Sequence, residues 1–464
     1  MKSPAQSLFI ALVCIGMNLV QAHPAEHGLW QAGLAKVAIT PDKPVWMAGY
    51  ASRNGPSEGK IVDIYARAMV LTDSANNQLA IITLDLIEIP ESLRDLLLQV
   101  TDKHGFKPSQ ILLNVSHTHG GPMVSSKTVA DWGIEPVWGK RADEFVQEVV
   151  QKVDIILARA IAEKKPANVS YSHARCGFAM NRRQPSPDGF RLGPNPDGPV
   201  DHDVPVLRIT NTDNRLIGVV FGYACHNTAL GATREIHGDF AGFAQQRLES
   251  EYPDAVALYL VGCGGDQDPS PRRDLADARQ NGLALASAVD GALSTAGIGL
   301  EPILATSLEN VALPFAKLPS RQELDARSKS GDGFVSRHAR MILKNWPKPD
   351  DQPPDYQYPV QVLAFGGKLA LVALGGEPTV DYSLRLKKEL SAANRPVWVA
   401  GYSNLVNAYI PSRRVLTEGG YEGNQAIIYQ ALPAPFQPSL EDRIINSVHS
   451  QFKALGLSAK NVVP

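Results

Sequence analysis

Short apolar segments that recur along the chain, each followed at once by polar residues, constrain its fold most strongly. Four segments have the length and the apolar composition of buried strands: residues 79–84, 111–115, 216–224 and 256–261. Between and after them, apolar residues recur at helical spacing in three longer segments: residues 142–164, 240–252 and 275–296. This alternation predicts the α/β class, as one large domain in which mixed sheets are covered by helices.

The rest of the chain contains one predicted hairpin and two irregular stretches. The hairpin pairs residues 360–365 with residues 369–374 across two consecutive glycines. Residues 182–204 and 344–358 are rich in proline, glycine or aspartate and are predicted to be long loops. Such loops act as binding loops or lids in some domains and as ordinary surface excursions in others, and the sequence leaves both open.

The polar residues that follow the four predicted strands are the candidates for chemistry. In open α/β sheets, ligands bind beyond the carboxyl ends of the strands. One such polar residue follows each segment: Asp85, His117, His226 and Asp266. We therefore expect all four side chains at one edge of the sheet.

The overall charge of the chain is nearly balanced. It has 45 lysine and arginine residues against 47 aspartate and glutamate residues, a formal net charge of -2, with 44% hydrophobic residues. These values are typical of a globular protein with a large core, and they create no overall field that favours nucleic acid or an anionic membrane. No charge-driven partner is expected, and no pattern indicates an oligomeric state.

Residues 1–22 resemble a secretory signal peptide. Lys2 precedes an apolar stretch over residues 8–20, and the small Ala22 closes the segment. The apolar stretch is short for crossing about 30 Å of hydrocarbon, so cleavage is favoured over a membrane anchor. We therefore expect a mature domain over residues 23–464 that has no transmembrane segment and is exported, either to the periplasm or out of the cell.

Three cysteines follow this segment, namely Cys176, Cys225 and Cys263. An odd number leaves at least one thiol unpaired, so at most one disulfide can form within the chain. The spacing CxxC of a thiolate zinc site does not occur. We interpret the three as small buried residues, although Cys225 and Cys263 lie in motifs that could be close together.

The most informative local pattern is the segment 114–122, NVSHTHGGP, which begins at the end of a predicted strand. In an extended chain, residues i and i+2 point to the same face, so His117 and His119 can enter one site. Neutral imidazole is a good zinc ligand. The pair therefore favours a metal site over two structural histidines.

Two further motifs follow apolar strands. His226 lies in the segment YACHNT and, taken alone, is as consistent with a structural histidine as with a ligand. Asp239 lies where a helix is expected to begin, and its carboxylate can cap the first amides. Residues 262–269, GCGGDQDP, contain glycines that permit close approach of the backbone to a ligand, with a plain turn as the alternative.

These three motifs, in this order, resemble the blocks His-Thr-His-Ser-Gly-Pro, His-Pro-Thr and Asn-Ala-Gly-(Asp/Asn)-x-Ser-Pro of the neutral/alkaline non-lysosomal ceramidases. Further short segments agree with that family: VAITP at 37–41, MAGY at 47–50, ARA at 66–68, MNR at 180–182, GEP at 376–378, GYSN at 401–404 and YEG at 421–423. The similarity covers nearly the whole expected mature chain. It implies the fold of that family's catalytic domain.

The resemblance also implies a zinc site whose ligands carry over motif by motif. His117 and His226 match two histidine ligands, and Glu377 in Gly-Glu-Pro matches the carboxylate ligand. Tyr409 matches a weakly held phenol. Two imidazoles and one carboxylate suit a catalytic zinc and leave room for water.

Two other residues match family positions beside the metal. His119 corresponds to a histidine that could orient the substrate carbonyl or stabilise charge. Arg182 corresponds to an arginine with a similar role, although the neighbouring Arg183 makes that choice ambiguous.

The chain departs from the family pattern at the nucleophile. The family has its nucleophilic serine immediately before a proline, whereas this chain has Asp268 before Pro269. Ser270 could take that place only through a local shift. The economical mechanism is attack by zinc-activated water, with Asp268 as general base or as the group that orients the water; a nucleophilic Asp268 is the less favoured variant.

The implied function is zinc-dependent hydrolysis of an N-acyl amide bond, in ceramide or in a related lipid or N-acyl compound. The alternatives are hydrolysis of an ester or lactone, and a non-catalytic ligand-binding relative that has lost its serine. A third alternative is a phosphoester hydrolase with magnesium or calcium on Asp239, Asp266 and Asp268, since clustered carboxylates prefer hard cations. Bound metal together with metal-dependent turnover separates an enzyme from a binding protein.

Overall fold

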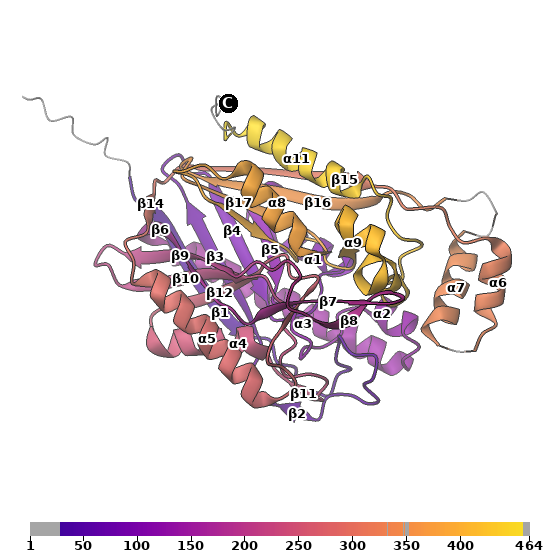
Figure 1. The fold of residues 1–464 in the computed structure, drawn as a ribbon. Coiled ribbons are helices and arrows are strands. Elements are labelled where there is room, and N and C mark those ends of the chain that lie inside the picture. Colours follow the sequence, from indigo (N-terminus) through magenta and orange to yellow (C-terminus); the bar gives the residue numbers. More distant parts are fainter. Residues whose placement is uncertain (1–27, 332, 347, 349–351, 458–464) are drawn as a thin grey trace, which may run out of the picture.

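The computed structural model describes residues 28–331, 333–346, 348 and 352–457. The segment that resembles a signal peptide lies outside these residues, so its cleavage and the export of the protein stay predictions. The described part is built around two stacked sheets enclosed between two layers of helices (Figure 1). This arrangement confirms the predicted α/β class with mixed sheets covered by helices.

The larger sheet has nine strands of mixed direction. Their order is β12-β10-β9-β6-β1-β3-β4-β5, with β14 beside β6. β4 and β5 are parallel, as are β10 and β12, and the other neighbours are antiparallel. In that order the strands span Val256–Val261, Leu216–Tyr223, Asp203–Asn211, Lys165–Arg175, Trp30–Ala38, Tyr65–Thr72, Gln78–Leu84 and Ile111–Val115, and β14 spans Ile298–Leu300.

The smaller stacked sheet has four strands in the order β15-β16-β17-β19. They span Leu304–Leu313, Tyr356–Phe365, Leu369–Leu374 and Val397–Ala400. β16 and β17 are antiparallel neighbours, which confirms the predicted hairpin, although β16 begins four residues earlier than expected.

Helices cover the outer face of each sheet. The larger sheet is covered by α1 (Glu91–Lys103), α3 (Pro136–Ala162), α4 (Asp239–Glu251) and α5 (Leu275–Leu293), and the smaller by α8 (Val380–Leu390) and α11 (Leu440–Ala454). α3, α4 and α5 confirm the three predicted helices. The remaining helices are α2 (Ser126–Asp131), α6 (Arg321–Ser328), α7 (Phe334–Asn345), α9 (Arg413–Glu418) and α10 (Ile427–Gln430), with single turns at Pro108–Gln110 and Tyr421–Gln425.

Burial of both faces explains the apolar runs of the larger sheet. Along β4, Leu79 and Ile81 face the smaller sheet, whereas Ala80 and Ile82 face the helical layer. Because successive side chains of a strand point to opposite faces, a strand buried on both faces is apolar at almost every position.

One predicted loop is instead a β-hairpin. Within and beside residues 182–204, β7 (Ala179–Ser186) pairs with β8 (Gly189–Asn195), and β13 (Gln267–Pro269) pairs with the other edge of β7. The loop prediction was wrong because small hairpins tolerate proline and glycine at their edges. Of the other predicted loop, the described residues between Asn345 and Tyr356 form no helix or strand, as expected.

A buried asparagine joins the two ends of the larger sheet. Asn114, in β5, accepts a hydrogen bond of 3.1 Å from Val261 N in β12 and donates one of 2.8 Å to Gly401 O, just after β19. β5 and β12 are the two outermost strands, so the sheet is strongly curved. The segments that follow β5, β10 and β12 therefore meet at one place.

Two smaller predictions concern the membrane and the thiols. None of the described helices is both long and apolar enough to cross a bilayer. Cys176, Cys225 and Cys263 are free and buried, as the interpretation of small buried residues predicted.

Candidate active site

A cavity of about 1720 Å³ lies beyond the carboxyl ends of β5 and β10. The seven side chains predicted as metal ligands or catalytic groups line it: His117, His119, Arg182, His226, Asp268, Glu377 and Tyr409. They come from segments spread over most of the described chain, and the curvature of the larger sheet brings these segments together.

Backbone carbonyls orient the two predicted histidine ligands. His117 Nδ1 lies 2.7 Å from Ile87 O, and His226 Nδ1 lies 2.7 Å from Gly264 O. Each Nδ1–H donates to its carbonyl, which leaves the lone pair of Nε2 directed at the cavity. His117 also has a left-handed backbone, with φ at 54°, a conformation uncommon outside glycine and concentrated at functional sites.

The carboxylate and the phenol occupy neighbouring positions in a short parallel ribbon. β18 (Glu377–Pro378) pairs with β20 (Tyr409–Ile410), with Glu377 opposite Tyr409. Glu377 Oε2 lies 3.3 Å from the Nε2 atoms of both His117 and His226. The backbone of Gly265 passes so close that a Cβ there would lie 2.6 Å from Glu377 O, which is why a glycine is needed.

These side chains fit a divalent metal ion. Among the described residues, Glu377 Oε2 is buried and accepts no hydrogen bond, although two imidazole nitrogens face it. Burial, followed by the charge of Arg182, lowers the pKa of His226 to about 4. Burial acts to raise the pKa of Glu377, but His117 and His226 outweigh burial and hold this pKa well below its usual value. At neutral pH the imidazole is neutral and the carboxylate is charged, the forms that bind metal.

His119 lies beside this centre. Its Nε2 is 3.4 Å from His117 Nε2, and the ligand atoms of His117, His119 and His226 all lie within 4.8 Å of one another. Burial, followed by His117, lowers the pKa of His119 well below its usual value. Gly49, at φ +98°, packs so closely that a Cβ there would lie 2.4 Å from His119 Nδ1. His119 is therefore a neutral imidazole held tightly at the edge of the centre.

The arginine that faces the cavity is Arg182. Its Nη2 donates a hydrogen bond of 2.9 Å to Tyr409 OH, its Nη1 lies 3.2 Å from Asp268 Oδ1, and its Nε lies 2.8 Å from Glu422 Oε1. Arg183 pairs instead with Glu422 Oε2 at 2.7 Å and does not line the cavity. The geometry distinguishes two residues that the sequence left ambiguous.

Asp268 is held between two arginines. One oxygen faces Arg182 and the other contacts Arg272. Burial acts to raise the pKa of Asp268, but Arg182 and Arg272 outweigh burial and lower the pKa below its usual value. Asp268 is therefore a weakly basic carboxylate at neutral pH. Ser270 also lines the cavity, but its hydroxyl makes no hydrogen bond within the part of the chain that the structure describes.

Asp85 does not reach the site, so that part of the edge prediction was wrong. It is buried, lies 3.1 Å from Arg67 Nη1 and accepts a hydrogen bond from Tyr65 N. Asp85 follows its strand in sequence as predicted, but its side chain turns to β3, where it balances the charge of Arg67.

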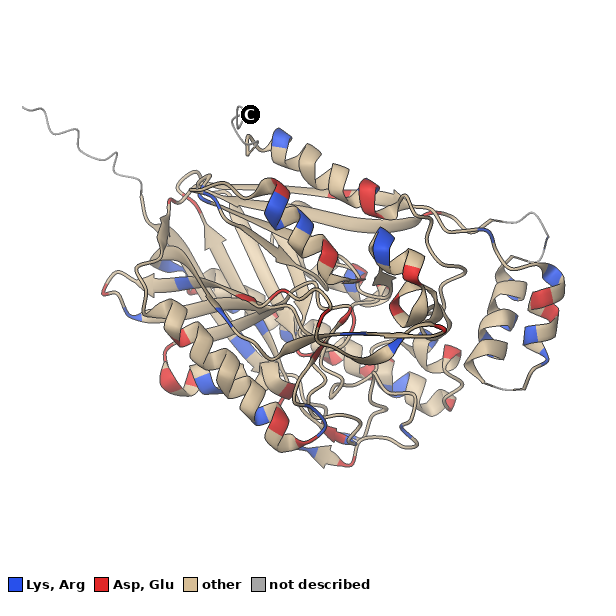
Figure 2. Cartoon of the chain, in the orientation of Figure 1, with Lys and Arg blue, Asp and Glu red and all other residues tan. Residues whose placement is uncertain are grey.

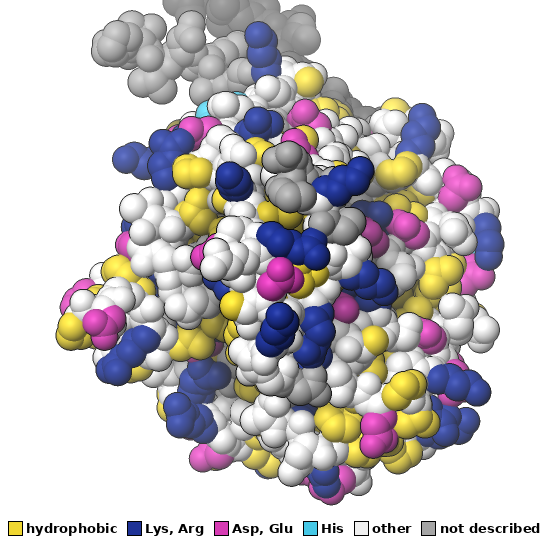
Figure 3. Space-filling view, turned by 90° about the vertical axis from the view of Figure 1, so that its right-hand side faces the viewer, with side chains coloured by type: hydrophobic (Ala, Val, Ile, Leu, Met, Phe, Trp, Pro, Cys, Tyr) yellow, Lys and Arg dark blue, Asp and Glu magenta, His cyan; other side chains and the backbone are white. Residues whose placement is uncertain are grey.

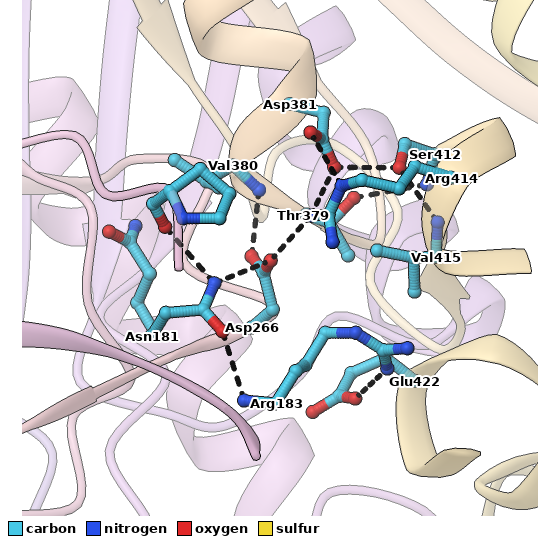
Figure 4. A network of polar contacts seen from close by, with 12 residues as sticks. Asn181, Arg183, Asp266, Thr379, Val380, Asp381, Ser412, Arg414, Val415 and Glu422 are labelled. Carbon is cyan, nitrogen blue, oxygen red and sulfur yellow. Dashed lines mark hydrogen bonds and ion pairs between the residues drawn. The ribbon is translucent and has the colours of Figure 1, made fainter. Parts of the chain in front are cut away.

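Asp266 supports the site from behind instead of lining the cavity, so its prediction was also wrong. Its Oδ1 accepts a hydrogen bond of 2.8 Å from Val380 N at the start of α8, and its Oδ2 accepts one of 3.2 Å from Asn181 Nδ2. Figure 4 shows it at the centre of a polar network that reaches Arg414. This network ties together the segments that carry Arg182 and Glu377.

The structure does not support a magnesium or calcium site on three aspartates. Asp239 is the first residue of α4, and its carboxylate accepts hydrogen bonds from Phe240 N and from Ala229 N and Leu230 N in the loop after β10. The N-cap of α4 is Gly238, so Asp239 mainly ties this loop to the helix instead of capping the helix as predicted. Among the described residues, no group of three or more histidine, cysteine, aspartate or glutamate side chains close enough together to hold a metal includes Asp239, Asp266 or Asp268.

Glu88 is a cavity residue that the sequence did not predict. This carboxyl lines the cavity next to Ile87, whose carbonyl orients His117, and it makes no hydrogen bond or ion pair within the described ranges. Burial, followed by Glu377, raises the pKa of Glu88 to about 7. A single glutamate after an apolar run has no pattern that would single it out, so only its place in the cavity identifies it.

Fold and site together define a layered α/β protein with a candidate metal centre in a deep cavity. The profile for "Neutral/alkaline non-lysosomal ceramidase, N-terminal" matches residues 30–262, which is half of the chain. The chain therefore belongs to the neutral/alkaline non-lysosomal ceramidase family, as its motifs predicted.

Relatives with this name are distant in sequence. "Neutral ceramidase" of Mycobacterium tuberculosis is 24% identical over 466 residues, which cover 82% of this chain and 71% of that protein. "Neutral ceramidase B" of Dictyostelium discoideum is 25% identical over 262 residues, which cover 53% of this chain and 35% of that protein.

Solved structures share the fold over almost the whole chain. The crystal structure of neutral ceramidase from Pseudomonas aeruginosa superposes with a TM-score of 0.69 at 18% identity, covering 93% of this chain and 74% of that one. A structure described as "Ceramidase complexed with C2" gives a TM-score of 0.72 at 18% identity, covering 94% and 77%. At this identity the likeness establishes the fold.

Proposed function

We propose that this protein is a zinc-dependent hydrolase that cleaves an N-acyl amide bond, in ceramide or in a related N-acyl lipid. The observation that carries the proposal is the convergence of His117 Nε2, His226 Nε2 and Glu377 Oε2, an oxygen without a hydrogen-bond donor, on the wall of one cavity. Membership of the ceramidase family supports the amide as the bond that is cleaved.

Zinc would be held by His117, His226 and Glu377. There it would supply a Lewis acid that polarises the acyl carbonyl and activates water. Tyr409 would be the weakest ligand, because burial raises the pKa of its phenol well above the usual value and its oxygen already accepts a hydrogen bond from Arg182.

Arg182 is suited to stabilise the negative charge that develops on the carbonyl oxygen. Three of its N–H groups are used by Tyr409, Asp268 and Glu422. A guanidinium has five N–H donors, so two remain for a substrate. A donor that is fixed before the reaction stabilises such charge without reorganisation.

Asp268 is better suited to hold neighbouring side chains in position than to act as a nucleophile or a general base. A nucleophile needs a free oxygen and a general base needs a pKa near the working pH. Both oxygens of Asp268 face arginines, and those arginines lower its pKa. We propose that Asp268 holds Arg182 and Arg272 in place, while the water that attacks the carbonyl is oriented by the surrounding side chains.

The test is the zinc content of the purified protein together with turnover of a fluorogenic N-acyl amide and its matched ester. We expect about one zinc per chain and amide cleavage that a chelator abolishes and added zinc restores. His226→Ala should lose both metal and activity. The matched control is His449→Ala, because His449 is exposed and pairs with Glu389 away from the cavity.

The outcomes distinguish the proposed amide hydrolase from an esterase and from a ligand-binding protein without activity. Full zinc content in both His117→Ala and His226→Ala would refute the ligand assignment. Bound zinc without turnover of either compound would favour a ligand-binding relative, and cleavage of the ester alone would favour an esterase.

A further inference from the structure

Two helices form a projecting lobe whose charge differs from that of the rest of the chain. α6 and α7 stand out from the body at one end of the molecule (Figure 1). We call residues 317–348 the helical lobe. Its basic residues are Lys317, Arg321, Arg327, Lys329, Arg337, Arg340, Lys344 and Lys348, and its acidic residues are Glu323, Asp325 and Asp332. The lobe thus carries a net charge of +5 in a chain whose net charge is -2.

Much of this positive charge is displayed to solvent. Figure 2 shows basic positions on both helices of the lobe, and the view onto this end of the molecule shows lysine and arginine side chains gathered near the centre of the face (Figure 3). Arg327, Lys329 and Lys344 are exposed, and within the described part of the lobe and body their side chains make no hydrogen bond or ion pair.

The same lobe forms part of the cavity wall. Met341 and Asn345 of α7, together with the adjoining Trp346, line the cavity that contains the candidate metal centre. The lobe packs on the body through the ring of Phe334, whose centroid lies 5.3 Å from that of Trp132. The charged surface and the cavity therefore share one helix.

One exposed apolar side chain lies on the lobe itself and another at the wall of the cavity that α7 also lines. Val335, beside Phe334 on α7, is 46% exposed, and Leu192, on β8 at the cavity wall, is 51% exposed. Basic residues next to exposed apolar residues are the combination that binds the surface of an anionic bilayer: the charge is attracted to the headgroups and the apolar side chains enter the interface.

We propose that the helical lobe docks this protein on an anionic phospholipid surface, so that a lipid substrate passes from that surface into the cavity beside α7. The proposal rests on the proposed function for its lipid substrate. A polyanion such as heparin would match the charge, but it would leave Val335 and Leu192 without a partner, so the lipid surface is the better match.

The experiment measures co-sedimentation with vesicles of phosphatidylcholine, either alone or mixed with phosphatidylglycerol. The test variant is Arg327→Gln/Lys329→Gln/Lys344→Gln. The matched control removes three exposed basic side chains elsewhere, as Arg215→Gln/Lys388→Gln/Lys453→Gln. Each basic residue near an anionic surface contributes about 1 kcal/mol, so we expect the lobe variant to bind mixed vesicles about a hundredfold more weakly and the control variant to bind within a few-fold of wild type.

Three results would overturn the proposal: equal binding of wild type to both kinds of vesicle, equal loss of binding in the two variants, or loss of heparin binding in the lobe variant with vesicle binding unchanged.

The vesicle assay does not depend on turnover, so it also applies to His226→Ala, which should bind vesicles like wild type even if the proposed chemistry is wrong. The lobe variant should hydrolyse a soluble short-chain amide at the wild-type rate. An equal loss of activity toward the soluble amide would mean that the lobe supports the fold of the active site and does not dock the protein on a membrane.

Discussion

Arg182 Nη1 lies 3.2 Å from Asp268 Oδ1, so Asp268 forms one half of an ion pair inside the cavity. Arg272 contacts the other carboxylate oxygen. Removing one partner of a buried pair leaves a charge uncompensated, which is costly. Asp268 is thus integrated into the cavity wall through both of its carboxylate oxygens.

Replacing Asp268 by Asn tests this pair. The variant removes the charge that Arg272 and Nη1 of Arg182 face, so that Arg182 is held only by Glu422 and Tyr409 and is less firmly fixed toward the substrate. We expect amide turnover to fall roughly tenfold to hundredfold, as for loss of one preorganised group that stabilises the transition state, with zinc content unchanged. Steady-state kinetics with metal analysis is the measurement. A wild-type rate would remove Asp268 from the mechanism, and a gain in rate with Asp268→Ser would mean that the site still supports serine chemistry.

Replacing Tyr409 by Phe tests the role of the phenol. His117, His226 and Glu377 remain, so zinc content should stay near one per chain, while turnover falls about tenfold because Arg182 loses a hydrogen bond of 2.9 Å. The matched control is Tyr382→Phe, whose hydroxyl donates to Pro411 O away from the cavity. Complete loss of zinc in the Tyr409 variant would show that the phenol is a principal ligand.

Replacing Glu88 by Gln tests a carboxyl whose pKa burial and Glu377 raise to about 7. The carboxylate form, which can accept a proton from water, becomes dominant as the pH rises through that value. We expect wild-type turnover to increase between about pH 6 and pH 8 and the increase to be absent in Glu88→Gln. Glu91→Gln, another cavity carboxyl, should keep the wild-type profile. An unchanged profile in Glu88→Gln would exclude a proton-transfer role.

Replacing Asp266 by Asn tests a contribution to stability. Burial raises the pKa of Asp266 to about 7, so the folded state binds a proton more tightly than the unfolded state. This group therefore makes the free energy of unfolding fall as the pH rises from about 4 to about 7, by up to about 1.4 kcal/mol per pH unit. Denaturant unfolding between about pH 4 and pH 7 should show this decrease in the free energy of unfolding in wild type and not in Asp266→Asn. Parallel pH profiles would contradict the assignment.

Much of the candidate site could be predicted because its motifs are local. His117 and His226 directly follow apolar strands, and a strand end brings the residue after it to the sheet edge. Glu377 and Tyr409 were reached only through resemblance to a family, since no spacing links them. In the structure, the two residues lie opposite each other because β18 and β20 pair as a parallel two-stranded ribbon.

The errors arose where a side chain could turn to either of two environments. Asp85 follows a strand as His117 does, yet it faces Arg67 in β3 and not the cavity. Asp266 lies two residues from Asp268, yet it faces the backbone of α8 and not the cavity. Strand position alone does not specify such a choice, because it depends on which charge or amide lies opposite.

The sequence by itself determined the α/β class, the four strands and three helices with strong periodicity, and the histidines at the ends of β5 and β10, because these depend on backbone geometry over a few residues. The tertiary structure decided which arginine enters the cavity, that Glu88 lines it, and that β5 and β12 approach through Asn114. These features depend on the curvature of a nine-stranded sheet and on hydrogen bonds between residues far apart in the chain, and no local pattern encodes them.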